Sequence, residues 1–498
     1  MTLTKKIAFN SSIQFIGRII SILLSAILLI FLTRYLGTEK YGYYTTVLAF
    51  VAIFNLFAEF GINQIVIQEI SRAPSKRTEI LSSGFFLKII VALIVFAVPP
   101  IIAYFLPYPI EIKIGILVAA LATFPLTIST LFNTIFQIHL KTSYQAIASV
   151  SNRILSLLLS LGFIYTHQPI YYFFLAILAG NCLEFIISYF NTQSLEKINI
   201  KFNKTYIQTY KRIFLASWPM ALAIGLGTLA FKIDTIMLSL LKTQEAVGIY
   251  GVPYKIVDIL ISIPSIFMGL VIPVMAQYYL KNKNLLKKSI QKSFDALIVA
   301  AFYVFVIVFL MAPYLINIIA GSSFSASAMP LRILTFAIVL MFIQAPFPSF
   351  LIASGFQKKL IWRNLMALIF NILINLLLIP LFSYNGAAIA TVITEALTMF
   401  LSLYLTYQAI KFLPSTRRIF SNIGAGAISF LIGFALIKFN IFISWNAFAQ
   451  YSFGIRILSF SAIFVIVSFF FFVFLVLFRG IDRKILSRLI PIKSINLE

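Results

Sequence analysis

The sequence has little charge and few side chains suited to covalent chemistry. Of its 498 residues, 11% are charged, and it holds only 14 acids, 2 histidines and 1 cysteine. A soluble domain has roughly 25% charged residues, and a soluble chain of this size needs a polar surface that this composition does not supply. Because Cys182 is the only cysteine, an intramolecular disulfide and a cysteine-based metal site are both impossible. We therefore exclude a soluble enzyme, a disulfide-rich secreted scaffold and a disordered binding segment.

Apolar residues dominate instead, at 61% of the chain with 52 phenylalanines, and they form long uninterrupted runs. A spanning helix needs roughly 20 consecutive, mostly apolar residues. The runs predict an all-α polytopic membrane protein with about fourteen transmembrane helices. The expected spans are 11–36, 42–68, 80–106, 112–138, 143–165, 169–192, 212–241, 246–277, 293–319, 330–353, 361–382, 385–410, 418–438 and 454–478.

Lysine and arginine total 39 and give a net charge of +25. If the N-terminus is cytoplasmic, the cytoplasmic loops carry most of these cations, and the positive-inside rule places both termini in the cytoplasm. We therefore interpret the basic excess as topological and expect no nucleic-acid partner. The outside loops are short, and the longest, 439–453, is too small to form a catalytic domain.

A weak internal repeat links the two halves of the chain. Three residues of the segment after the first span recur at a constant offset of 206 positions after the seventh span. The matched residues are Glu39 with Glu245, Gly42 with Gly248, and Tyr44 with Tyr250. Segments 152–159 and 371–378 also resemble each other.

An even number of spans per half makes the repeat parallel. We expect a six-helix N-lobe (1–205), a six-helix C-lobe (206–412), and two C-terminal helices with a basic tail (413–498). Two pseudo-symmetric lobes of this kind favour a transporter that works by alternating access.

Several short motifs resemble those of a known family. They are Leu32–Tyr44 (LTRYLGTEKYGYY), Phe60–Gln64 (FGINQ), Gln68–Arg72 (QEISR), Lys232–Leu238 (KIDTIML), Val247–Tyr250 (VGIY) and Tyr254–Ile256 (YKI). Together they resemble the Wzx-type oligosaccharide flippases, the polysaccharide transport branch of the multidrug/oligosaccharidyl-lipid/polysaccharide (MOP) exporter superfamily. The resemblance runs over the whole chain and includes the fourteen-helix count.

The resemblance implies a fold like that of the MATE (multidrug and toxic compound extrusion) exporters and a function without covalent chemistry. A member flips undecaprenyl-pyrophosphate-linked oligosaccharide from the inner to the outer leaflet of the bacterial plasma (inner) membrane. The product serves synthesis of O-antigen in lipopolysaccharide, capsule or another exopolysaccharide. We expect a monomer in the lipid bilayer, with a polysaccharide polymerase and a chain-length regulator as further partners. We expect no cofactor and no metal, with H⁺, Na⁺ or the membrane potential as the energy source.

Charges inside the expected spans are the candidate site residues, because a charge at mid-bilayer usually faces a cavity or a partner. A cationic cavity that attracts pyrophosphate is predicted from Arg18, Lys88, Arg153, Lys232 and Lys255. The alternative for each cation is snorkelling to the nearest interface, and for Arg332, close to a helix end, we prefer that interpretation. The acids Glu59, Glu184, Asp234, Asp258 and Glu395 are interpreted as ion-coupling or structural groups.

Two of these acids illustrate the alternatives. Asp258 lies three residues after Lys255 and could pair with it on one helix face. Asp234 lies two residues after Lys232, about 200° around a helix, and so needs a partner on another helix or a coupling ion.

Other functions remain open. A lipid II flippase and a multidrug or small-molecule exporter share the expected fold, although an exporter typically has twelve helices and a less cationic cavity. A membrane polysaccharide polymerase is disfavoured by the short outside loops. The run Phe469–Phe474 is interpreted as lipid-facing surface.

Overall fold

The computed structural model describes residues 3–59, 61–196, 204–438 and 451–478. These residues form α-helices with short 3₁₀ segments, and no strand occurs among them. Each of the fourteen expected spans falls on helical structure, and eleven helices are long and apolar enough to cross a membrane. The prediction of an all-α polytopic membrane fold is confirmed. The division into lobes stays a prediction.

The chain forms two compact units. The first contains Met1–Gly251 and Asn364–Pro380, and the second contains Val252–Arg363 and Leu381–Glu498. Two helices, α8 (Gln244–Lys281) and α12 (Gln357–Ile410), contribute residues to both units.

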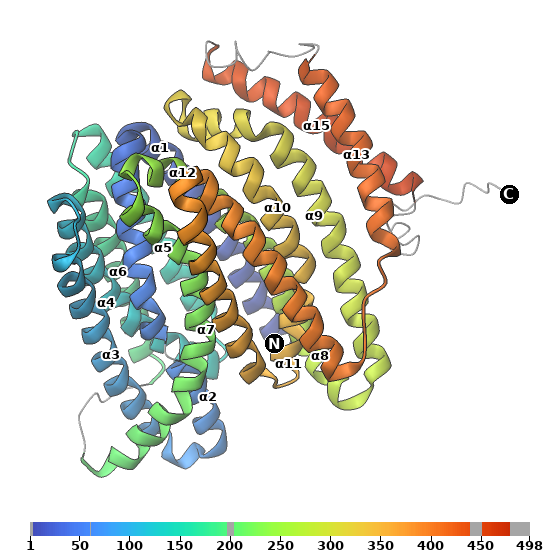
Figure 1. Ribbon diagram of the computed structural model, residues 1–498. Helices are drawn as coiled ribbons and strands as arrows, with labels where there is room; N and C mark the ends of the chain where they lie inside the picture. The colour runs from blue at the N-terminus through green and yellow to red at the C-terminus, as the bar shows by residue number, and fades with distance from the viewer. Residues whose placement is uncertain (1–2, 60, 197–203, 439–450, 479–498) are drawn as a thin grey trace. The chain divides into compact units, whose positions relative to one another are not determined.

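The other helices of the first unit are α1 (Leu3–Glu59), α2 (Ile62–Arg72), α3 (Arg77–Phe105), α4 (Ile110–Ile138), α5 (Ser143–Tyr165), α6 (Tyr171–Gln193) and α7 (Ile207–Leu241). Helices α3 to α6 lie side by side in Figure 1, with α4 packed on both α3 and α6, and α5 packed on α6. An apolar cluster fixes α2 against α3 and α4 through Val66, Phe85 and Phe132, each nearly or fully buried. These large side chains stabilise the unit by close packing, because lipid outside the helices is itself apolar.

Two long helices contain breaks that separate neighbouring expected spans. In α1 the break is at Gly37 (φ 68°, ψ −177°), between the first and second spans. This left-handed φ favours glycine, because any Cβ is strained there. In α12 the break is at Ser383 (φ 51°, ψ −132°), between the eleventh and twelfth spans.

The second unit contains α9 (Lys283–Ala320), α10 (Ala328–Gln344), α11 (Pro346–Ala353), α13 (Arg417–Lys438) and α15 (Phe453–Leu477), with the remaining parts of α8 and α12. Helix α9 packs on α10 and also on the α13–α15 pair. Gly433 of α13 permits this packing, because an added Cβ there lies 2.7 Å from Leu310 of α9 and 2.8 Å from Val467 of α15.

The phenylalanine run of α15 does not face one way. Phe469 is 62% exposed, as expected of lipid-facing surface, whereas Phe471 is fully buried and its ring contacts Tyr303 of α9. Consecutive helical residues point about 100° apart, so a continuous apolar run must present both faces. The lipid-facing interpretation is therefore wrong for Phe471.

Candidate functional site

The repeat segments meet each other within the first unit. An added Cβ at Gly42 lies 1.8 Å from the carbonyl oxygen of Gln244, and one at Gly248 lies 1.8 Å from the carbonyl oxygen of Thr38. Thr38 and Gln244 are themselves 206 positions apart, so the contact is reciprocal. Such reciprocity is what a local twofold relation between the segments produces. Only glycine lets the two backbones come this close.

Side chains add polar bonds around this glycine contact. Thr46 Oγ1 donates to Gln244 Oε1 at 2.7 Å, and Thr38 Oγ1 lies 3.5 Å from Glu245 Oε1. The glycine contact therefore joins α1, just after its break, to the first turns of α8. The sequence showed the repeat but gave no sign that its copies touch.

A buried carboxylate lies near the second repeat segment. Asp234 of α7 is 1% exposed. Its Oδ2 accepts a hydrogen bond from the Tyr250 hydroxyl at 3.2 Å, and its Oδ1 accepts one from Asn375 Nδ2 at 2.7 Å. The partners lie on α8 and α12, and all three residues belong to the first unit. Asp234 thus has partners on two other helices, one of which is the tyrosine of the repeat motif.

The hydrogen bonds of this carboxylate extend through Asn375 to a second asparagine, Asn371. Asn375 Nδ2 also donates to Asn371 Oδ1 at 2.9 Å, while Asn375 Oδ1 finds no hydrogen-bond donor among the described residues. Carboxylate and carboxamide oxygens are the ligand types that hard cations prefer. We call Asp234, Tyr250, Asn371 and Asn375 the Asp234 cluster. Within it, only the Asp234 carboxylate is acidic.

The five predicted cations lie on five helices. Lys88 of α3 is fully buried, whereas Arg18 of α1 and Arg153 of α5 are exposed. Lys232 of α7 is half-buried, with its ammonium 5.0 Å from the centre of the Phe231 ring. The fifth, Lys255 of α8, is half-buried in the second unit. That these cations share one cavity stays a prediction.

Two of the predicted acids bond to carboxamides. Glu184 accepts from Asn152 Nδ2 at 2.6 Å, in the first unit. In the second unit Glu395 accepts from Gln344 Nε2 at 2.5 Å, and Gln344 Oε1 in turn accepts from Arg363 at 2.7 Å. These bonds offset the cost of burying a carboxylate. Asp258 is half-buried on α8, and the side chain of Glu59 lies outside the described residues.

A charged cluster joins several helix ends of the first unit. Arg77 at the start of α3 binds both carboxylate oxygens of Glu196, just after α6, through bonds that include Nε–Oε1 at 2.9 Å. His139 Nε2, after α4, lies 2.7 Å from Arg77 Nη2. Because arginine only donates, this histidine nitrogen accepts. The three residues are far apart in sequence, so no local pattern could have revealed the cluster.

Comparison with known proteins complements this geometry. The family model described as "Polysaccharide biosynthesis protein" matches residues 3–279, and the MatE model matches residues 219–377. The probable low-salt glycan biosynthesis flippase Agl15 of Haloferax volcanii is 24% identical over 465 residues, covering 90% of each chain.

Solved structures share the fold. The lipid II flippase MurJ in an inward closed conformation superposes with a TM-score of 0.73 at 14% identity, covering 93% of this chain and 99% of that one. The inward-facing conformation of a multidrug resistance MATE transporter superposes with a TM-score of 0.64 at 14% identity, covering 78% of this chain and 94% of that one. At such identities these structures show the fold alone.

The fold and the family together define a polytopic membrane transporter rather than an enzyme. The chain belongs to the polysaccharide biosynthesis protein family, within the MOP exporter superfamily. The family resemblance of its motifs is thereby confirmed.

The glycine contact predicts that Gly42→Ala lowers stability. Its Cβ must displace a backbone carbonyl, and overpacking of this kind typically costs about 1–3 kcal/mol. The apparent melting temperature of the purified protein measures the effect. Gly162→Ala is the control, because its Cβ meets no atom within 4 Å, and we expect it to melt at or above the wild-type temperature. Equal melting of the two variants contradicts the prediction.

Proposed function

We propose that the protein flips undecaprenyl-pyrophosphate-linked oligosaccharide repeat units from the inner to the outer leaflet of a bacterial plasma membrane. The observation that carries the proposal is the match of the polysaccharide biosynthesis family model to residues 3–279. A glycan biosynthesis flippase that aligns over 90% of both chains supports it. The undecaprenyl carrier, the plasma membrane and the cytoplasmic termini rest on the sequence motifs and the loop charges.

Transport by such a protein requires no bond to be made or broken. The substrate carries a charged pyrophosphate that must pass the low-dielectric interior, where fixed cations lower the barrier. We propose that Arg18, Lys88, Arg153, Lys232 and Lys255 supply this field while the two expected lobes alternate in access. Arginine suits the task because its guanidinium can donate two parallel bonds to phosphate.

We further propose that the Asp234 cluster couples transport to an ion gradient. Its carboxylate is buried and bonded to side chains of two other helices, and its partner Tyr250 belongs to the repeat segment of the glycine contact. Occupation of the carboxylate by H⁺ or Na⁺ removes an acceptor from the Tyr250 hydroxyl. Because Tyr250 lies in the first turns of α8, this changes how the start of α8 is held against α7. The protein acts as a monomer and delivers its product to a polymerase and a chain-length regulator that build O-antigen, capsule or exopolysaccharide.

Deletion of the gene tests the flippase proposal. We expect surface glycan to disappear and lipid-linked repeat units to accumulate in the inner leaflet, because synthesis continues without translocation. Mass spectrometry of extracted lipids and surface staining with a lectin measure the two effects. Accumulation of lipid II instead identifies a lipid II flippase, and normal glycan without accumulation rejects the proposal.

Complementation of that strain tests the cationic residues. We expect Arg18→Ala and Lys232→Ala each to reduce surface glycan about tenfold, because loss of a charge-assisted bond to phosphate costs about 1.5–3 kcal/mol. Lys288→Ala removes an exposed cation of α9 and serves as the control. Membrane levels of each variant are measured by immunoblot. Wild-type glycan in both test variants excludes these residues from the substrate path.

Asp234→Asn tests ion coupling. The substitution keeps the side-chain volume and one oxygen acceptor but removes the charge that attracts a cation. In proteoliposomes with an imposed Na⁺ or H⁺ gradient, we expect the variant to lose the gradient-driven stimulation of flipping that the wild type shows. Glu39→Gln neutralises an exposed acid of α1 as the control. Undiminished stimulation in Asp234→Asn assigns the carboxylate a structural role only.

A further inference from the structure

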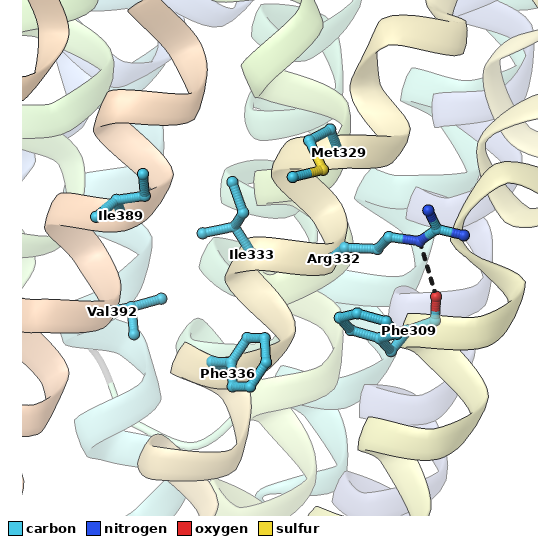
Figure 2. A pocket seen from close by; sticks show the side chains of 7 residues that line it. All are labelled: Phe309, Met329, Arg332, Ile333, Phe336, Ile389 and Val392. Atoms are coloured by element: carbon cyan, nitrogen blue, oxygen red, sulfur yellow. Dashed lines mark hydrogen bonds between the residues drawn. The ribbon is translucent and has the colours of Figure 1, made fainter. Parts of the chain in front are cut away.

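A recess in the second unit contains Arg332, the arginine that we expect to reach the nearest membrane interface. It is a cavity of about 420 Å³ between α9, α10 and α12, lined by six apolar residues and one arginine, Arg332. Figure 2 shows Phe336 and Ile333 of α10 opposite Ile389 and Val392 of α12. We call this recess the Arg332 groove.

The groove opens on the surface of the unit. Met329 and Phe336, which line it, are 55% and 47% exposed. The helices that form it are among those long and apolar enough to cross a membrane. An exposed apolar groove at membrane depth is in contact with lipid chains rather than with water.

Arg332 is bound on one side only. Its Nε donates to the carbonyl oxygen of Phe309 at 3.1 Å, and its guanidinium carbon lies 5.6 Å from the centre of the Phe309 ring. No acidic partner occurs for it among the described residues, and the two terminal nitrogens point away from the Phe309 carbonyl in Figure 2. Because arginine is always charged, the N–H groups of those two nitrogens can donate hydrogen bonds to an anion.

The position of Arg332 along α10 indicates how deep in the membrane such an anion would lie. Arg332 is the fifth residue of α10, which begins at Ala328. At 1.5 Å per residue it lies about 6 Å from the helix start. A cation this close to the end of a spanning helix reaches the level of lipid phosphates, while the groove beyond it lies at the level of the chains.

We propose that the Arg332 groove binds one anionic phospholipid. The phosphate accepts hydrogen bonds from the terminal nitrogens of Arg332, and an acyl chain lies against Phe336, Ile389 and Val392. The Phe309 carbonyl and ring hold the guanidinium in place, so little side-chain entropy is lost on binding. A phospholipid fits better than the pyrophosphate-linked carrier, because the groove offers one cation and otherwise only apolar side chains.

Native mass spectrometry of the full-length protein in detergent tests the proposal, with phosphatidylglycerol and phosphatidylcholine as probes. We expect phosphatidylglycerol to bind more tightly to the wild type. Arg332→Gln should weaken its binding about tenfold, equal to about 1.4 kcal/mol, and weaken phosphatidylcholine binding less, because the choline cation already balances the charge of that lipid's phosphate. Lys438→Gln removes an exposed cation at the end of α13 and should change neither affinity.

A second variant distinguishes the contribution of the lipid's acyl chain from that of its headgroup. Val392→Phe fills the groove and leaves Arg332 in place, so both lipids should bind more weakly. The proposal is overturned if Arg332→Gln keeps the wild-type preference for phosphatidylglycerol, or if Val392→Phe changes neither affinity. It is also overturned if undecaprenyl diphosphate displaces phosphatidylglycerol from the wild type at equal or lower concentration. The outcomes for Arg332→Gln and Val392→Phe do not depend on the substrate that the protein flips.

Discussion

Water is absent from the interior of a bilayer, and this one constraint determines most of the structure. Each backbone amide and carbonyl in that region needs a partner within the protein, which a helix supplies locally. Helix breaks are therefore costly, and of the two breaks at Gly37 and Ser383 only the first has a residue that adopts a left-handed φ without strain. The same constraint applies to side chains. Glu184, Asp234 and Glu395 each accept hydrogen bonds from a side chain on a neighbouring helix.

Two kinds of charge follow from this constraint. We expect the numerous loop cations to orient the chain in the membrane. The few charges inside helices need a specific reason to be there, and the structure gives different reasons for different residues. Asp234 bonds to the repeat tyrosine and to Asn375, and Arg332 lies in an apolar groove with its Nε bonded to the Phe309 carbonyl. The charged cluster of Arg77, His139 and Glu196 joins helix ends.

The glycine contact joins the two copies of the internal repeat. Gly42 and Gly248 let two helix starts approach until their backbones touch. The backbone contact is supported beside it by the hydrogen bond from Thr46 to Gln244. Tyr250 lies two residues after Gly248 and bonds to Asp234, so the second helix start is joined directly to the buried carboxylate.

The sequence by itself determined the all-α membrane fold, all fourteen expected spans and the family, because hydropathy over about 20 residues and short motifs are local properties. It also marked Asp234 as a residue that needs a partner, since Lys232 points away from it. Only the tertiary structure decided which groups meet. Asn375, Tyr250 and Asp234 come from three helices, and Arg77 lies more than a hundred positions from Glu196. The pairing of such residues depends on helix rotation and packing, which apolar periodicity does not specify when lipid and protein interior are equally apolar.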